Sequence, residues 1–286
     1  MFPFRKILFP VDYSAPCDAV VPYVKEMVRR FSADLTLVHA YGPEALALMA
    51  LPVTDPDLAD RLRAHEEQRL REFALETFPG QHVESFSQLG EAGTVIHTIV
   101  QHQGTDLVML ATHGRGPIRR FLLGSVAAKV LHDISAAVWT GSGVALTGQA
   151  PQIPYKSVLC ALDDSDEAAG VLKAAAAFAC NYQAQLWLVQ IVEIPPPNPE
   201  VDFSPYKKDI MDAAHCRLRE LKGQAGIDAP HAVIDGAVAD GVRDEAVRRK
   251  ADLIVTGRGR AQAEFSRIWS HVYPIVRESP CPVLSI

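Results

Sequence analysis

The sequence predicts an α/β protein built from two tandem doubly wound domains, each a five-stranded parallel sheet with helices on both faces. Apolar runs of strand length alternate with stretches of helical periodicity along the chain. The runs are nearly continuous in Val, Ile and Leu, which is typical of strands buried on both faces. The whole order then occurs a second time. Right-handed crossovers between parallel strands would wind each copy into a sheet covered on both sides.

The first half of the chain holds the strand-length runs ILFPV (7–11), LTLVHA (35–40), the weaker HVESFSQL (82–89), LVMLA (107–111) and AAVWT (136–140). Residues 15–31, 57–78, 91–103 and 125–133 lie between them and have helical spacing. In the first of these stretches Val20, Val24 and Met27 fall on one face, at spacings of three and four. A helix is therefore expected between each pair of consecutive strands.

Four segments of the second half match the first half in the same order. KSVLCALDDS (156–165) lies over RKILFPVDYS (5–14), which places Asp163 on Asp12 and Ser165 on Ser14. The other matched pairs are 186–191 with 35–40, 252–260 with 106–114, and 279–286 with 133–140. This order indicates a duplication. Domains are expected at residues 1–142 and 155–286, and the small, Pro- and Gly-containing segment 143–154 is the expected linker.

Composition excludes several classes of protein. A net charge of -6 argues against a nucleic-acid binder whose affinity rests on neutralising phosphates. Five scattered cysteines without a Cys-x-x-Cys pair favour reduced thiols over a disulfide framework or a zinc site. Neither a signal peptide nor a run of the ~20 apolar residues that a membrane helix needs is recognisable. We therefore expect a cytoplasmic protein with no membrane segment.

In a doubly wound sheet, ligands bind beyond the carboxyl ends of the strands. Asp12 follows the first run, Ala40 ends the second, and the fourth run continues into LATHGRGPIRRFLLGS (110–125). Gly124 and Ser125 stand at the start of an expected helix, whose unpaired N–H groups favour an anion. Arg115 could neutralise the anion's charge. The segment fits a phosphate site, although a simple glycine turn would use the same residue types.

Other sequence motifs do not fit. No Lys precedes Ser125, as a Walker A motif would require, and Arg119 breaks a Rossmann G-x-G-x-x-G pattern. A nucleophile elbow and a zinc-protease motif are both missing from the sequence, and His113 has no recognisable catalytic partner. Asp163, Asp164 and Asp166 are interpreted as a turn and an acidic helix start in preference to a metal or general-acid cluster.

The segment ATHG, followed by nine residues and GS, resembles the motif G-x-x-G-(nine residues)-G-[ST] of the universal stress protein family. The resemblance extends to ILFPVDYS, LTLVHA and ESPCPVLSI, and it covers nearly the whole chain twice, apart from the linker and residues 42–80 and 194–225. It implies the universal stress protein fold, which is like that of adenine nucleotide alpha hydrolases. It also implies pairing of domains through their last strands, and ATP as ligand, with or without Mg²⁺.

Carried over position by position, the resemblance implies a nucleotide site in the first domain at Pro10, Val11, Asp12, Ala40, Ala111, His113, Gly114, Arg115, Gly124, Ser125 and Val126. Asp12 would contact the adenosine part and the Ala40 backbone the base, while the glycine segment and Ser125 would hold ribose and phosphates. Ala111 replaces the first glycine of the motif, which costs little if the backbone there is extended. In the second copy Arg260, Ser270 and His271 replace motif residues, so we expect no ATP there.

The resulting functional hypothesis is an ATP-binding protein of stress response or signalling, without catalytic residues. Its second domain would act as an internal dimer partner, and a homodimer of chains is compatible with the family. Two alternatives stay open. One is a slow nucleotide hydrolase or adenylating enzyme that uses Arg115, His113 or Asp12. The other is a scaffold that no longer binds nucleotide.

Overall fold

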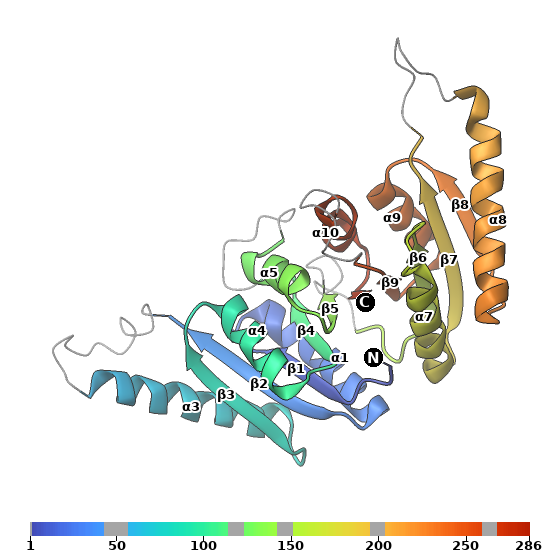
Figure 1. Ribbon diagram of the computed structural model, residues 1–286. Helices are drawn as coiled ribbons and strands as arrows, with labels where there is room; N and C mark the ends of the chain where they lie inside the picture. The colour runs from blue at the N-terminus through green and yellow to red at the C-terminus, as the bar shows by residue number, and fades with distance from the viewer. Residues whose placement is uncertain (1, 43–56, 114–122, 142–150, 195–203, 259–267) are drawn as a thin grey trace, which may run out of the picture. The chain divides into compact units, whose positions relative to one another are not determined.

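The computed structural model describes residues 2–42, 57–113, 123–141, 151–194, 204–258 and 268–286. The chain divides into two compact units, one largely within residues 3–146 and the other within residues 147–286 (Figure 1). Of the expected linker, residues 143–154, only 151–154 are described, and they form neither helix nor strand. Every helix in the described parts of the chain is too short or too polar to span a lipid bilayer.

The first unit is a five-stranded parallel sheet in the order β3-β2-β1-β4-β5. Its elements are β1 (Lys6–Pro10), α1 (Ala15–Phe31), β2 (Asp34–Tyr41), α3 (Leu58–Thr77), β3 (Val83–Leu89), α4 (Ala92–Gln103), β4 (Leu107–Ala111), α5 (Ser125–Asp133) and β5 (Ala137–Gly141). The strand order reverses between β1 and β4, and such a switch point is where open α/β sheets bind ligands.

The second unit repeats the arrangement as a parallel sheet in the order β8-β7-β6-β9-β10. Its elements are β6 (Ser157–Leu162), α7 (Ala168–Tyr182), β7 (Gln185–Val192), a 3₁₀ turn (Ser204–Tyr206), α8 (Lys207–Ala225), β8 (His231–Asp235), α9 (Val238–Arg249), β9 (Leu253–Thr256), α10 (Ile268–Glu278) and β10 (Val283–Ser285). The two equivalent sheets confirm the predicted fold class and the duplication.

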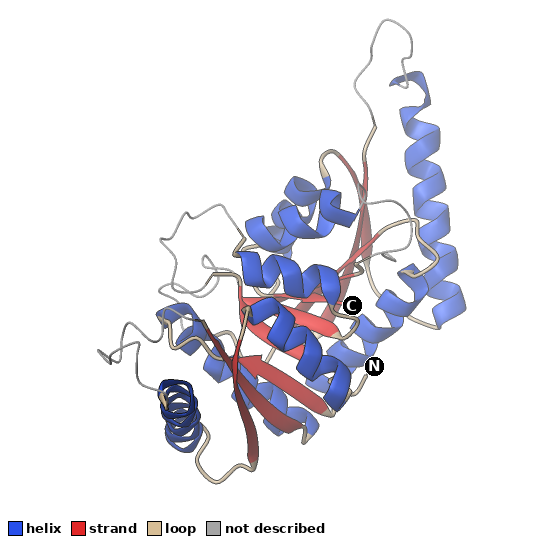
Figure 2. Ribbon diagram, turned by 60° about the vertical axis from the view of Figure 1, so that its left-hand side comes forward, coloured by secondary structure: helices blue, strands red, loops and turns tan. Residues whose placement is uncertain are grey.

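Helices cover both faces of each sheet (Figures 1 and 2). In the first unit α4 packs against α5, whereas α3 packs against β2 and β3 from the other side. Right-handed crossovers require this division, because the connections after β1 and β2 run in one direction across the sheet and those after β3 and β4 run in the other. The second unit follows the same rule, with α9 packed against α10.

The core lies between these layers. Val20, Val24 and Met27 of α1 are fully buried, which confirms the face predicted from their spacing. All residues of β4 except the last, Ala111, are buried as well. A strand that is covered by helices on both faces has no side chains that point to solvent. Its sequence is therefore a continuous apolar run, without alternation of apolar and polar residues.

One aspartate in each unit fixes the start of the central strand. The Asp106 carboxylate accepts hydrogen bonds from the backbone N–H groups of Arg5 (2.7 Å) and Lys6 (2.9 Å). Asp252 occupies the equivalent position and accepts from Lys156 (2.7 Å) and Ser157 (3.1 Å). Each carboxylate directly precedes β4 or β9, so it sets the register of the two strands that flank the switch point.

Candidate functional site

The end of β1 forms a turn around Asp12. The Asp12 Oδ1 atom accepts hydrogen bonds from the Ser14 backbone N–H (3.0 Å) and the Ser14 hydroxyl (2.6 Å). The Ser14 Oγ atom in turn accepts from the Cys17 N–H and caps α1. Tyr13, between Asp12 and Ser14, has a φ of 56°, in the left-handed region that residues other than glycine rarely occupy. Asp12 is therefore held, half-buried, at the carboxyl end of the central strand.

The end of β2 lies against this turn. Val11 donates its N–H to the Val38 carbonyl oxygen at 2.8 Å, and the His39 Nδ1 atom lies 2.7 Å from the Val11 carbonyl oxygen. Pro10 pairs with Val38 in the sheet, so Asp12 and Ala40 each lie two residues past this pair at the same edge. The structure thus brings these two predicted site residues to neighbouring strand ends.

Beneath this edge lies a charged cluster that sequence reasoning missed. Glu66 of α3 is buried, and its Oε2 atom is 3.4 Å from His39 Nε2 and 3.8 Å from Arg69 Nη1. The Arg69 guanidinium stacks on the Tyr13 ring, 3.9 Å from its centroid. In the sequence, Arg69 falls at a position of residues 57–78 where helical periodicity would place an apolar residue. This was the one hint of the cluster, and it did not indicate which residues Arg69 contacts.

The glycine segment begins at the end of β4. Ala111 lies in the strand and pairs with Gly141, so its backbone is extended and the missing glycine costs little, as expected. Thr112 Oγ1 lies 3.0 Å from His113 Nδ1. The buried His113 Nε2 atom has no hydrogen-bond partner within the described parts of the chain. Gly114 and Arg115 lie outside the described residues, as does everything up to residue 122.

The far end of the segment returns to β4 through Gly124. Its N–H donates to the Thr112 carbonyl oxygen at 2.8 Å, and a Cβ atom on Gly124 would lie 2.9 Å from that oxygen. Glycine is needed because the two backbones approach so closely. Gly124 is also the N-cap residue of α5, where no side chain caps the helix. The first N–H groups of α5, including those of Ser125 and Val126, therefore start next to the end of β4.

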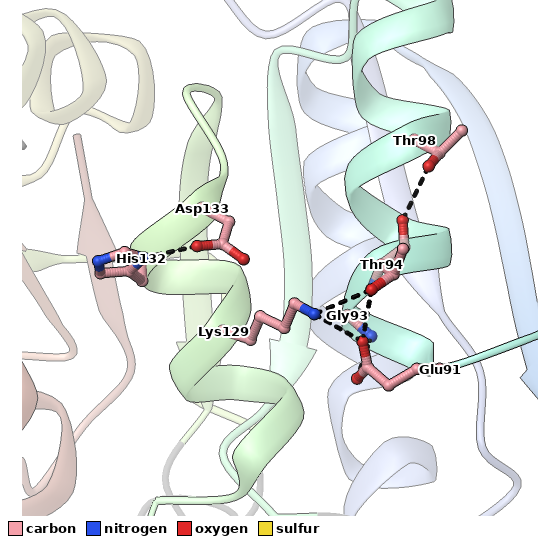
Figure 3. Close-up of polar contacts among 7 residues, drawn as sticks. All are labelled: Glu91, Gly93, Thr94, Thr98, Lys129, His132 and Asp133. Carbon is pink, nitrogen blue, oxygen red and sulfur yellow. Dashed lines mark hydrogen bonds and ion pairs between the residues drawn. The ribbon is translucent and has the colours of Figure 1, made fainter.

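A clamp between α4 and α5 holds the latter helix in place (Figure 3). The Glu91 carboxylate caps α4 by accepting from the N–H groups of Gly93 and Thr94, both at 2.9 Å. Lys129 of α5 donates to Glu91 (2.8 Å) and to the Thr94 hydroxyl (2.9 Å). The hydrogen bond from Lys129, with those from Thr94 and Gly93, lowers the pKa of Glu91 to about 2.

The second unit keeps the aspartate turn but changes its surroundings. Asp163 Oδ1 accepts from the Ser165 N–H (3.1 Å) and hydroxyl (2.6 Å), as in the first unit, but here both residues are exposed. Asp164, in the position of Tyr13, accepts from the Gln190 amide and from Arg217. Among the described residues no three His, Cys, Asp or Glu side chains are grouped to hold a metal ion. Residues 164–167 form turns and bends that lead into α7.

The helix after β9 also differs from its counterpart. It begins at Ile268, so Ser270 and His271 lie inside its first turn, whereas Gly124 precedes α5 and Ser125 begins it. Arg260 lies outside the described residues.

The cysteines are free in both units. Burial raises the pKa of the Cys17 and Cys281 thiols to about 12, and it raises that of Cys160 as well. All three side chains are packed in the core, where burial disfavours the thiolate form.

Comparison with known proteins agrees with this geometry. The sequence profile of the Universal stress protein family matches residues 3–140 and 154–286. A universal stress protein of Thermus aquaticus is 30% identical over 138 residues, which cover 46% of this chain and 98% of the relative.

Two solved structures match the chain over nearly its full length. A universal stress protein from Archaeoglobus fulgidus has a TM-score of 0.70 at 19% identity and covers 99% of this chain and 98% of its own. A protein of unknown function from Pseudomonas aeruginosa has a TM-score of 0.68 at 14% identity, with 99% and 92% covered. These two likenesses show the fold, and the double match of the family profile shows that the chain is a tandem member of the universal stress protein family.

Proposed function

We propose that the chain binds ATP in its first domain and serves in stress response or signalling. The observation that carries this proposal is the contact between Gly124 and the Thr112 carbonyl oxygen. It places the N-terminus of α5 beside the end of β4, and β4 is the neighbour of β1, whose end carries Asp12. A helix N-terminus, where unpaired N–H groups favour anions, and a carboxylate thus flank the switch point.

The chemistry of these groups suits a nucleoside triphosphate. The N–H groups at the start of α5, together with Arg115, would bind phosphate oxygens. The Asp12 carboxylate would accept hydrogen bonds from the adenosine part, and the Ala40 backbone would contact the base. The buried His113 Nε2 atom, which has no partner among the described residues, would gain one from the ligand. A Mg²⁺ ion, where present, would be held mainly by phosphates and water.

The second domain is proposed to have lost ATP binding. Its Asp163 turn is exposed and is followed directly by Asp166 and Glu167. Additional carboxylates at a strand end disfavour a polyphosphate by repulsion. Association of the two domains as an internal pair, and a homodimer of chains, are proposals that rest on the family resemblance.

Two matched substitutions test the location of the site. Asp12→Ala and Asp163→Ala remove the same turn hydrogen bonds, so their structural consequences are comparable. Isothermal titration of the full chain with ATP should show affinity weakened about tenfold or more by Asp12→Ala, since a hydrogen bond to a charged group contributes about 1.5–3 kcal/mol. Asp163→Ala should leave the affinity unchanged. Equal effects of the two substitutions would refute a site confined to the first domain.

Slow hydrolysis is a second candidate function, favoured by the position of His113. Its ring lies at the beginning of the glycine segment, with Nδ1 against the Thr112 hydroxyl. If His113 moves a proton for an attacking water, the protein will turn over many ATP molecules per chain and His113→Ala will abolish this activity. Recovery of unhydrolysed ATP from the purified protein would instead support binding alone.

A further inference from the structure

The cluster beneath the Asp12 turn holds one peptide group in place. The buried His39 ring directs Nδ1 at the Val11 carbonyl oxygen, 2.7 Å away. A carbonyl oxygen can only accept, so Nδ1 carries the hydrogen and donates it. The Val11 N–H is bonded to Val38 on the same strand as His39. Strand β2 therefore fixes both polar groups of Val11, the residue directly before Asp12.

The Glu66 carboxylate lies against the other nitrogen of the ring, and it can accept from the ring only when Nε2, like Nδ1, carries a hydrogen. Its Oε2 atom lies 3.4 Å from Nε2, and Glu66 is only 4% exposed. That oxygen has no hydrogen-bond partner of normal geometry among the described residues. The carboxylate also lies 3.3 Å from His65 Nδ1, through Oε1, and 3.8 Å from Arg69 Nη1, so its neighbours are groups that carry or can carry a positive charge, as a buried carboxylate requires. Here the carboxylate faces a ring whose opposite nitrogen supports the turn.

The same cluster supports the strained residue of the turn. Tyr13 has a φ of 56°, and its ring contacts both the His39 ring (centroids 4.8 Å apart) and the Arg69 guanidinium. A non-glycine residue persists in this conformation only where its surroundings enforce it. Since Tyr13 directly follows Asp12, its conformation helps to set the direction of the Asp12 carboxylate.

The second domain lacks this arrangement. Gln190 stands in the position of His39, and its amide donates to the side chain of Asp164, which is the counterpart of Tyr13. Asp164 is not among the residues with a positive φ. The histidine, the buried glutamate and the strained tyrosine thus occur together in the domain proposed to bind ATP, and the contrast links them to the ligand.

We propose that His39, oriented by Glu66, is a positioning residue for nucleotide binding. It acts through the Val11 carbonyl group and the Tyr13 turn, and it directs the Asp12 carboxylate toward the adenosine part of ATP. This inference rests on the proposed ATP site of the first domain. It adds that the affinity of this site for ATP depends on His39, a side chain that need not contact ATP itself.

Three variants of the full chain test the inference by ATP titration, with thermal unfolding measured in the absence of ATP. His39→Leu removes the donor and leaves the Val11 carbonyl oxygen unpaired, so ATP affinity should fall about tenfold. His39→Gln keeps an N–H donor and should restore the affinity to within about threefold of that of the unchanged protein. Gln190→Leu is the matched control, and it should leave the affinity unchanged although it also removes a hydrogen bond.

The outcomes separate this inference from the proposed function. If His39→Leu does not weaken ATP binding, or if His39→Gln weakens it as much as His39→Leu does, the inference alone is overturned. Absence of ATP binding by the unchanged protein would overturn both. A measurement independent of folding defects is the imidazole ¹⁵N spectrum of the unchanged protein, with the His39 signals assigned by their loss in His39→Gln. A protonated Nδ1 is expected, and an unprotonated Nδ1 at neutral pH would overturn the inference.

Discussion

At Gly124 and His231 the surrounding atoms restrict which side chain, or which protonation state, the position accepts. At Gly124 the backbone of the glycine segment touches the Thr112 carbonyl oxygen, and no side chain fits between them. At His231 the Nε2 atom lies 3.4 Å from His215 Nδ1, and Lys222 and Arg219 add positive charge nearby. At Gly124 there is no room for a side chain, and at His231 a positive charge on the ring is disfavoured. Each constraint leads to a measurable effect on stability.

Gly124→Ala should destabilise the protein even without ATP. The new Cβ atom would lie 2.9 Å from a backbone oxygen, which cannot move as a side-chain tip can. We expect the free energy of unfolding to fall by about 1–3 kcal/mol, as for other overpacked sites. Urea unfolding measures this change. Gly170→Ala in α7 is the control, because a Cβ there meets nothing within 4 Å. If both variants are as stable as the unchanged protein, the close approach does not exist.

The stability of the second domain should fall as the solution becomes acidic. Burial, then the charges of Lys222, His215 and Arg219, lower the pKa of His231 below its usual 6.5. The unfolded chain therefore binds this proton more readily than the folded chain, and folding loses free energy as pH falls through 6.5 toward the lower folded value.

The corresponding measurement is urea unfolding of the unchanged protein and of His231→Gln at about pH 8 and about pH 5.5. His231→Gln should lose less stability on acidification, because the amide does not titrate. An identical loss in both proteins would show that His231 does not contribute to the acid sensitivity.

At the scale of elements, the proposed site depends on how α5 is held. Lys129 of α5 donates to the Glu91 carboxylate (Figure 3). The same carboxylate caps the N-terminus of α4, so Glu91 both caps one helix and joins it to the next. Gly93 makes this possible, since a Cβ atom there would lie 2.7 Å from Lys129 Cδ. The clamp holds the helix whose N-terminus is proposed to bind phosphates.

Glu91→Ala should cost about 1 kcal/mol of unfolding free energy and no more, because 55% of the side chain is exposed and solvent screens the pair. The pKa of Glu91 is lowered from 4.5 to about 2, so its stabilising effect is complete above pH 4.5 and is lost as pH falls toward 2.

Unfolding curves recorded across this acidic range should therefore converge for the unchanged protein and Glu91→Ala. Arg63→Met, which removes an exposed ion pair with Asp60 on α3, is the control and should have little effect at any pH. A difference between the unchanged protein and Glu91→Ala that stays constant down to the lowest pH would contradict the role given to the carboxylate.

Elements were largely predictable from the sequence, whereas contacts between elements were not. The limits of α1, β4 and α5 agree with the predicted ranges to the residue, because apolar periodicity and the Ser14 cap are local signals. The pairing of His39 with Glu66 joins β2 to α3, and no pattern in either segment encodes it. The start of α10 at Ile268 places Ser270 and His271 inside the helix, a difference from Gly124 and Ser125 that the matched sequence positions did not indicate.

At the scale of the whole molecule, the chain carries one arrangement twice and differs in what each copy places at its strand ends. In the first domain the half-buried Asp12 turn is supported by His39. The N-terminus of α5 lies at the neighbouring strand end, where Gly124 donates its N–H to the Thr112 carbonyl oxygen. The second domain keeps the turn and the sheet but places Asp164, Gln190 and Arg217 at the corresponding edge. We therefore propose that the first domain binds the ligand and that the second has lost this ability.

The number of ATP molecules bound per chain tests this account most directly. Native mass spectrometry of the gently purified full-length protein, before and after addition of excess ATP, gives that number for each chain. We predict a single ATP per chain, lost in Asp12→Ala and retained in Asp163→Ala. Two ATP molecules per chain, none at all, or one that is lost only in Asp163→Ala would contradict the account.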